Sequence, residues 1–160
     1  MIVIADTSPL NYLVQIGQSD LLSLLYKRIV IPVAVYEELM HLDAPPIVRQ
    51  WVLRTPGWLE IRTPQTLADA DLIRADLDSG ERDAILLAQE LGARELIIDD
   101  RDGRREAQRR NLHFVGTLGV LRLAADKDLV DFNEAVERLR ATNFHVSQSV
   151  IDLFTRHNKH

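Results

Sequence analysis

The sequence predicts an α/β protein, a mostly parallel sheet of about five strands between two layers of helices. Three observations favour this fold class. Short apolar, β-branched runs alternate with longer segments of helical period, as in strands joined by crossover helices. No internal repeat or low-complexity linker interrupts the 160 residues, so one compact domain is expected. Apolar residues make up 46% of the chain, which is enough for a substantial core.

Five segments have the apolar character of buried strands, and ten others have helical period. The expected strands are 2–5, 28–32, 58–62, 95–98 and 112–116. The expected helices are 9–16, 20–27, 33–42, 46–54, 68–77, 81–91, 103–110, 117–126, 131–141 and 147–157. The last two helices follow the final strand at some distance. We therefore expect a core over residues 1–126 and a helical extension, 127–160, packed on the same domain.

Composition excludes several kinds of chemistry. The chain has no cysteine, which rules out disulfides, thiolate zinc sites and cysteine nucleophiles. No apolar run approaches the roughly 20 residues of a membrane span, and the N-terminus lacks the pattern of a signal peptide, so the expected location is cytoplasmic. A net charge of −5 disfavours a large nucleic-acid surface.

One segment is strongly basic although the chain as a whole is acidic. It spans 101–110 and contains Arg101, Arg104, Arg105, Arg109 and Arg110. These arginines follow a pair of aspartates directly. The alternative to a binding role is an ordinary solvated helix face held by salt bridges.

Acidic residues follow two of the expected strands at the point where each strand ends. Asp6 follows the run 2–5, and Asp99–Asp100 follow the run 95–98. Ligand sites of open α/β sheets lie outside the carboxyl ends of the strands. Carboxylates that converge there need a cation to offset their repulsion. The sequence therefore predicts an acidic metal site at this edge.

Helical angle selects one further acid and leaves a second choice open. At about 100° per residue, Glu38 lies on the shoulder of the apolar stripe of its helix and Glu37 lies on the opposite face. In helix 81–91, Asp83 and Glu81 occupy the two shoulders of the stripe, so angle cannot choose between them. Glu81 can close a capping box with Asp78, which makes Asp83 the better site candidate.

Each acid also has an ordinary structural explanation. Asp6 can cap the helix that follows it, and Asp99–Asp100 can cap the helix 103–110. Asp83 can complement a helix dipole in the first turn. Glu38 can be a plain surface charge. Their joint order along the chain favours a shared site over four separate explanations.

Five stretches of the chain together resemble the PIN-domain family of metal-dependent nucleases, including small prokaryotic members of the VapC-toxin type. They are VIADTSPL (3–10), IPVAVYEEL (31–39), SGERDAILLAQELGA (79–93), IIDDRDGRREA (97–107) and FVGTLGVLRLA (114–124). Each stretch alone is common, but their order and spacing follow the family. The segment after residue 124 resembles PIN-like proteins with an extended C-terminal helical segment.

The resemblance implies a three-layer α/β/α fold and an RNA-hydrolysing site with one or two Mg²⁺ or Mn²⁺ ions. Carried over by position, the acids are Asp6, Glu38, Asp83 and Asp99, with Asp100 as the alternative to Asp99. Thr7 and Ser8 match the small hydroxyl residues that order water or substrate. Arg101, Arg104 and Arg105 would hold the RNA backbone, and the family also implies a homodimer and a possible antitoxin partner.

Two other functions compete with an endoribonuclease. One is a catalytically inactive PIN-like module that binds nucleic acid or protein, and the complete set of acids counts against it. The other is a metal-dependent phosphatase with Asp6 as nucleophile. Such enzymes usually place an aspartate two residues further on, where this chain has Ser8.

Overall fold

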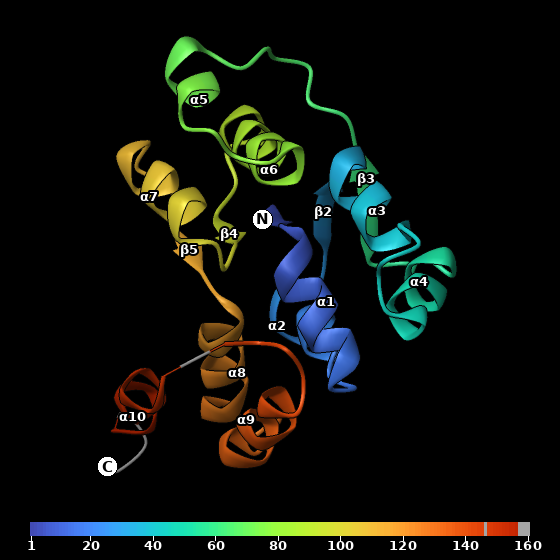
Figure 1. The fold of residues 1–160 in the computed structure, drawn as a ribbon, viewed down its shortest axis with the longest axis vertical. Coiled ribbons are helices and arrows are strands. Elements are labelled where there is room, and N and C mark those ends of the chain that lie inside the picture. The colour runs from blue at the N-terminus through green and yellow to red at the C-terminus, as the bar shows by residue number, and fades with distance from the viewer. Residues whose placement is uncertain (146, 157–160) are drawn as a thin grey trace.

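A computed structural model describes residues 1–145 and 147–156 of the chain (Figure 1). All five expected strands are present: β1 (Val3–Ala5), β2 (Ile29–Pro32), β3 (Leu59–Arg62), β4 (Glu95–Ile97) and β5 (Phe114–Val115). They form one sheet in the order β3-β2-β1-β4-β5, and every neighbouring pair is parallel. The predicted fold class is confirmed.

The helices also follow the expected order along the chain. They are α1 (Thr7–Gln15), α2 (Asp20–Tyr26), α3 (Val33–Met40), α4 (Pro46–Leu53), α5 (Ala70–Arg74), α6 (Ser79–Leu91), α7 (Arg101–Arg109), α8 (Thr117–Asp126), α9 (Phe132–Arg140) and α10 (Gln148–Arg156). Helices α1, α6 and α7 begin two residues earlier than periodicity predicted. Residue 157, the last of the expected final helix, lies outside the described residues.

Side chains of the central strands alternate between two apolar layers. Val3 and Ala5 of β1 pack with α1, α2, α8 and α9 on one face, whereas Ile4 packs with α5, α6 and α7 on the other. Central strands buried on both faces are typical of parallel sheets covered by crossover helices. The result is the three-layer arrangement that the sequence predicts, with both layers of helices visible around the sheet (Figure 1).

The described part of the C-terminal segment shares the larger of the two apolar clusters. Phe132 and Leu139 of α9 and Ile151 of α10 are buried in it. Between these helices, Phe144 meets the ring of Tyr12 on α1 edge-on, with 4.9 Å between centroids. The segment after α9 is therefore held against α1.

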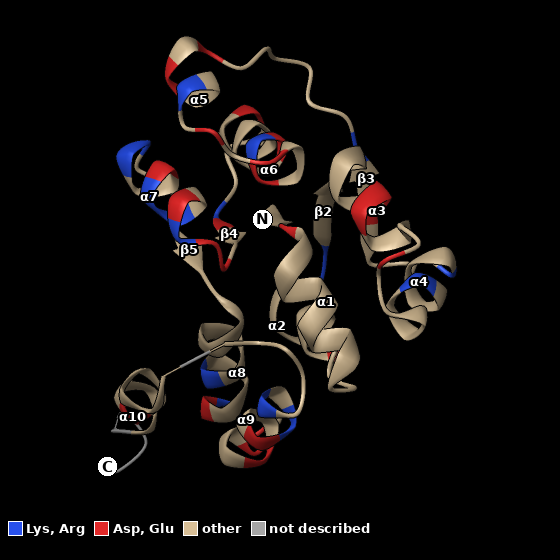
Figure 2. Ribbon diagram, in the orientation of Figure 1, with Lys and Arg blue, Asp and Glu red and all other residues tan. Residues whose placement is uncertain are grey.

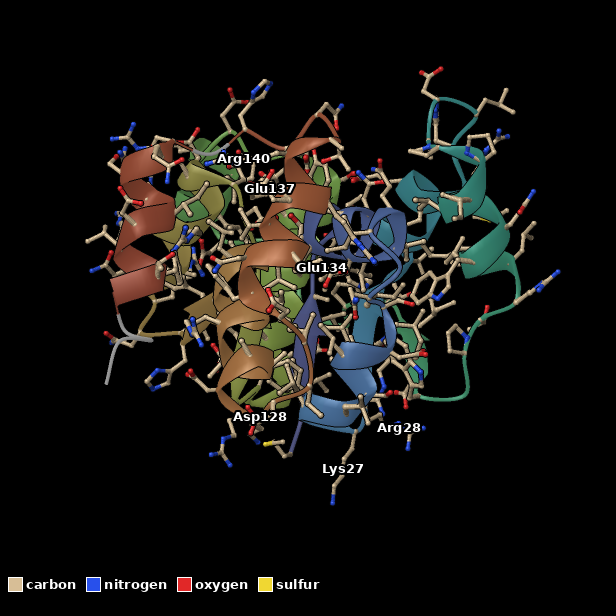
Figure 3. The ribbon with its side chains drawn as sticks, turned by 90° about the horizontal axis from the view of Figure 1, so that it is seen from below. Lys27, Arg28, Asp128, Glu134, Glu137 and Arg140 are labelled. Carbon is tan, nitrogen blue, oxygen red and sulfur yellow. The ribbon has the colours of Figure 1, made fainter. Side chains whose placement is uncertain are left out.

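The strand order reverses beside β1. The chain builds β1, β2 and β3 toward one edge of the sheet and then adds β4 and β5 on the other side of β1. Such a switch point, at the carboxyl ends of the strands, is where ligands bind in open α/β sheets. Figure 3 distinguishes the two ends of the molecule, with Lys27 and Arg28 just before β2 at one end and Arg140 toward the other.

In the part of the chain that the structure describes, no helix combines the length and the apolar character needed to cross a membrane.

Candidate active site

Acids from four separate elements surround the switch point between β1 and β4. The backbone amide of Asp6 donates to the carbonyl oxygen of Ile97 at 2.9 Å, so the ends of β1 and β4 lie side by side. Figure 2 shows acidic segments at the start of α1, along α3 and α6, and in the turn after β4. The convergence that the strand ends predicted is present in the fold.

Asp6 is the most enclosed acid of this group. Asp6 occupies the N-cap position of α1, but its side chain makes no capping hydrogen bond. Helix capping therefore does not explain the carboxylate, and a role in the site does. Only 4% of the residue is exposed, and Oδ1 has no hydrogen-bond partner among the described residues. Burial, and then the charges of Asp78, Glu38 and Asp99, raise the pKa of Asp6 to about 7.

Glu38 is held in place from two sides. The Thr7 hydroxyl donates to its Oε2 at 2.5 Å, and the backbone amide of Gly80 stabilises the same carboxylate. Burial raises the pKa of Glu38, which these two hydrogen bonds oppose. Glu37 is exposed, as the helical angle predicted. Thr7 thus connects the start of α1 to α3, while Ser8 is half-buried beside it.

On α6 the structure groups Glu81, rather than Asp83, with the other acids. Burial, and then the charges of Asp78, Asp100 and Asp6, raise the pKa of Glu81 to about 8. Asp83 accepts a hydrogen bond from the Arg82 guanidinium at 3.2 Å. It is not among the described carboxylates that raise the pKa values of Asp6 and Glu81. The role expected for Asp83 therefore stays a prediction.

The preference for Asp83 rested on a capping role for Glu81, and that role is present. The Glu81 backbone amide donates to Asp78 Oδ1 at 2.8 Å, and the Asp78 amide in turn stabilises the Glu81 carboxylate. Capping and membership of the acid group are compatible, because the first turn of α6 itself faces the strand ends. An alanine Cβ at Gly103 of α7 would come within 3.9 Å of Glu81 Cγ.

Asp78 is the acid that sequence reasoning missed as a site residue. Its charge raises the pKa values of Asp6, Glu38 and Glu81, so it lies among them. Its position directly before the SGER segment is a signal for both roles, the N-cap of α6 and a member of the acid group.

The two aspartates after β4 have different surroundings. Asp100 caps α7, its Oδ2 accepting from the amides of Asp102 and Gly103. Asp99 accepts from the amide and the hydroxyl of Thr117 at 2.7 and 2.6 Å. Burial raises the pKa of Asp99, whose charge acts on Asp6, while the charge of Asp100 acts on Glu81. Both therefore border the group, and the choice between them stays open.

The arginines of α7 and its C-cap divide into two sets. Arg110 is tied to Asp69 at 2.8 Å, in agreement with the salt-bridged alternative. Arg101 and Arg105 are exposed and form no ion pair within the described residues. Arg104 lies over the Phe114 ring, 5.1 Å from its centroid, and its charge lowers the pKa of Asp99. Cations thus flank the acids on the α7 side.

A metal site is compatible with this group by donor chemistry. Among the residues described, no three carboxylate or histidine side chains are close enough to form a ready-made cage. The oxygens are nevertheless hard donors of the kind Mg²⁺ and Mn²⁺ prefer. Asp6 Oδ1 in addition is a buried acceptor without a partner, which costs free energy unless a cation or donor meets it.

These raised pKa values predict a pH-dependent stability in metal-free protein. Folding favours the protonated form of Asp6, so its ionisation destabilises the folded state as pH rises from about 4 to about 7. Asp6→Asn should match the wild type near pH 4 and exceed it at pH 8 by a few kcal/mol. Urea denaturation in EDTA at several pH values measures the difference, and a difference that does not grow with pH contradicts the prediction.

Fold and site together define a class: a parallel α/β protein with an acidic centre at its topological switch point. The chain matches the model of the PIN-domain family over residues 2–159. It therefore belongs to the PIN-domain family, which confirms the resemblance seen in the motifs.

Two other comparisons add little to the family match. The chain is similar to a PilT N-terminus domain protein from the hyperthermophilic archaeon Sulfolobus solfataricus. Identity is 13%, coverage is 92% of this chain and 100% of that one, and the TM-score is 0.49. A search among curated proteins gave no match.

Proposed function

We propose that this chain is a Mg²⁺- or Mn²⁺-dependent endoribonuclease that hydrolyses RNA phosphodiester bonds. The observation that carries the proposal is Asp6, a buried carboxylate with one unpartnered oxygen and three neighbouring acids. Membership of the PIN-domain family supports the nuclease class. RNA as substrate, the metal requirement and the roles of individual residues are the proposed parts.

In this proposal Asp6, Glu81 and one of Asp99 and Asp100 hold the cation. A bound divalent ion supplies a more acidic water and offsets charge on the phosphate. Thr7 fixes the Glu38 carboxylate beside the group, so that its orientation does not depend on solvent. Arg104, with Arg101 and Arg105 of the same helix, contacts the RNA backbone, which positions the strand without reading its sequence.

The direct test is cleavage of an end-labelled single-stranded RNA by the purified chain. We expect internal cleavage with Mn²⁺ or Mg²⁺ and none in EDTA. Calorimetric titration with Mn²⁺ alone separates this function from the inactive binding module, which the absence of a ready-made cage among the described residues favours. No Mn²⁺ binding at millimolar concentration would support the module.

A pair of variants tests which acid of α6 belongs to the site. We expect Glu81→Gln to weaken Mn²⁺ binding about tenfold or more, and Asp83→Asn to weaken it much less. The reason is that Glu81 interacts electrostatically with Asp6 and Asp100, which raise its pKa. Both substitutions remove one charge from the same helix, so each is the control for the other. The reverse order of effects would restore the assignment of Asp83.

The remaining proposals concern partners. We propose a homodimer and, where a small neighbouring gene encodes a DNA-binding protein, an antitoxin for this chain. Light scattering of the purified chain tests the first. Growth arrest on expression that is relieved by the neighbouring gene tests the second.

A further inference from the structure

A cavity of about 780 Å³ opens beside the acids and has no role in the proposed chemistry. It shares Thr7 and Glu38 with the acid group, and its other walls come from α1, the segment after α3 and residues 141–143. Its size is within the range of about 300–1,000 Å³ that is usual for small-ligand sites. Because the cavity shares Glu38 with the acid group, a ligand in it would lie beside these acids.

One wall of the cavity is a polar stripe on α1. Thr7, Asn11 and Gln15 recur every four residues, so they lie on one helix face. The Gln15 side-chain amide donates to Asn11 Oδ1 at 3.0 Å. This bond leaves the Asn11 amide nitrogen as a donor and the Gln15 carbonyl oxygen as an acceptor, neither with a partner among the described residues.

A third amide borders the cavity from the segment that follows α9. The Tyr12 hydroxyl donates to Asn143 Oδ1 at 3.1 Å, and Tyr12 also contacts the Phe144 ring. These contacts fix residues 143 and 144 against α1. The Asn143 amide nitrogen remains available as a donor. Two separate segments thus present neutral hydrogen-bonding groups to one space.

The charge of the lining excludes a phosphate as the ligand. No lysine or arginine lines the cavity, and Glu38 and Asp43 contribute carboxylates. Neutral amides that offer donors and an acceptor instead match the edge of a heterocyclic base, which asparagine and glutamine recognise by paired hydrogen bonds. His41 and Pro45 supply flat and apolar surface of the kind that a base can contact.

We infer that this cavity binds one nucleobase of the RNA, that of the nucleotide next to the scissile phosphate, and so sets a base preference for cleavage. The inference rests on the proposed ribonuclease function. Asn11, Gln15 and Asn143 read the base edge. The C-terminal segment thereby becomes part of the substrate site through Asn143.

The test uses short single-stranded RNAs that differ in one base beside the cleaved bond. For each variant, kcat/KM is measured with the four RNAs. Each value is divided by the kcat/KM of the same variant for Mn²⁺-dependent hydrolysis of bis(p-nitrophenyl) phosphate, an ester without a base. We expect wild-type preference for one base to fall about tenfold in Asn11→Ala. Asn133→Ala, an exposed asparagine on α9, is the matched control and should keep the preference.

Asn143→Ala provides a second variant from another segment, in case the first does not fold. Equal cleavage with all four bases, or a preference that both variants keep, overturns the inference and leaves the nuclease intact. If wild type cleaves neither RNA nor the ester, the proposed function fails instead. Calorimetry with the four uncharged nucleosides then decides: binding that Asn11→Ala weakens upholds the base site, and no binding refutes it.

Discussion

Replacement of Asp6 by asparagine is expected to reduce metal-dependent RNA cleavage about 10³-fold, the rate equivalent of about 4 kcal/mol. Asparagine keeps the size of the side chain but removes the charge that would face the cation. The fold should survive, because the Asp6 carboxylate makes no capping bond and is buried at a cost. Initial rates on labelled RNA with Mn²⁺ measure the loss of cleavage, and thermal melting in EDTA measures whether the fold is kept.

Asp20→Asn is the control for this experiment. Asp20 is an exposed acid in the first turn of α2, so its loss changes net charge equally at a position away from the strand ends. We expect wild-type cleavage from it. Cleavage retained in Asp6→Asn would remove the basis of the proposed function.

The second large effect is expected from Gly80→Ala. A Cβ at this position would lie 2.5 Å from Glu38 Oε1, so the carboxylate must move away from Thr7 and the Gly80 amide. The displaced atoms are the far end of a flexible side chain, and alanine favours the helix by up to about 1 kcal/mol over glycine. Stability should therefore hold, while cleavage falls about a hundredfold from a small misplacement.

Gly57→Ala is the matched substitution for Gly80→Ala. A Cβ at Gly57 meets nothing within 4 Å, so the same chemical change occurs in open space. Its cleavage rate and melting temperature should equal those of the wild type. If Gly80→Ala cleaves RNA at the wild-type rate, the fixed position of Glu38 is not required for activity.

The order of strands and helices followed from local signals. An acid follows the apolar run 2–5 directly, and another follows the apolar end of the run 95–98. Both runs form central strands, and their acids lie at the same edge of the sheet. Buried strands of this kind need no alternating pattern, which is why short apolar runs were enough. Helix boundaries moved by about two residues, since caps decide them and Asp78 and Asp100 cap earlier than periodicity indicated.

The choice on α6 could not be made from the sequence. Helical angle left Glu81 and Asp83 on equivalent shoulders. Two of the charges that raise the pKa of Glu81, those of Asp6 and Asp100, come from segments that only the fold brings to α6. The four-residue spacing of Thr7, Asn11 and Gln15 is a sequence signal that these side chains share one helix face, on which they line the cavity. Asn143 has no such signal, because only the fold brings it to α1.

The reversal of strand order beside β1 has a consequence for biosynthesis. Asp6 and Glu38 lie in the first quarter of the chain, whereas Asp99 follows β4, more than 60 residues later. A nascent chain that has completed β1, β2 and β3 therefore carries Asp6 and Glu38 but still lacks the acids of α6 and of the turn after β4. The site is completed when β4 joins β1, and the wall at Asn143 is added last. The acidic group is thus complete only once the chain has been made through Asp100 and β4 has paired with β1.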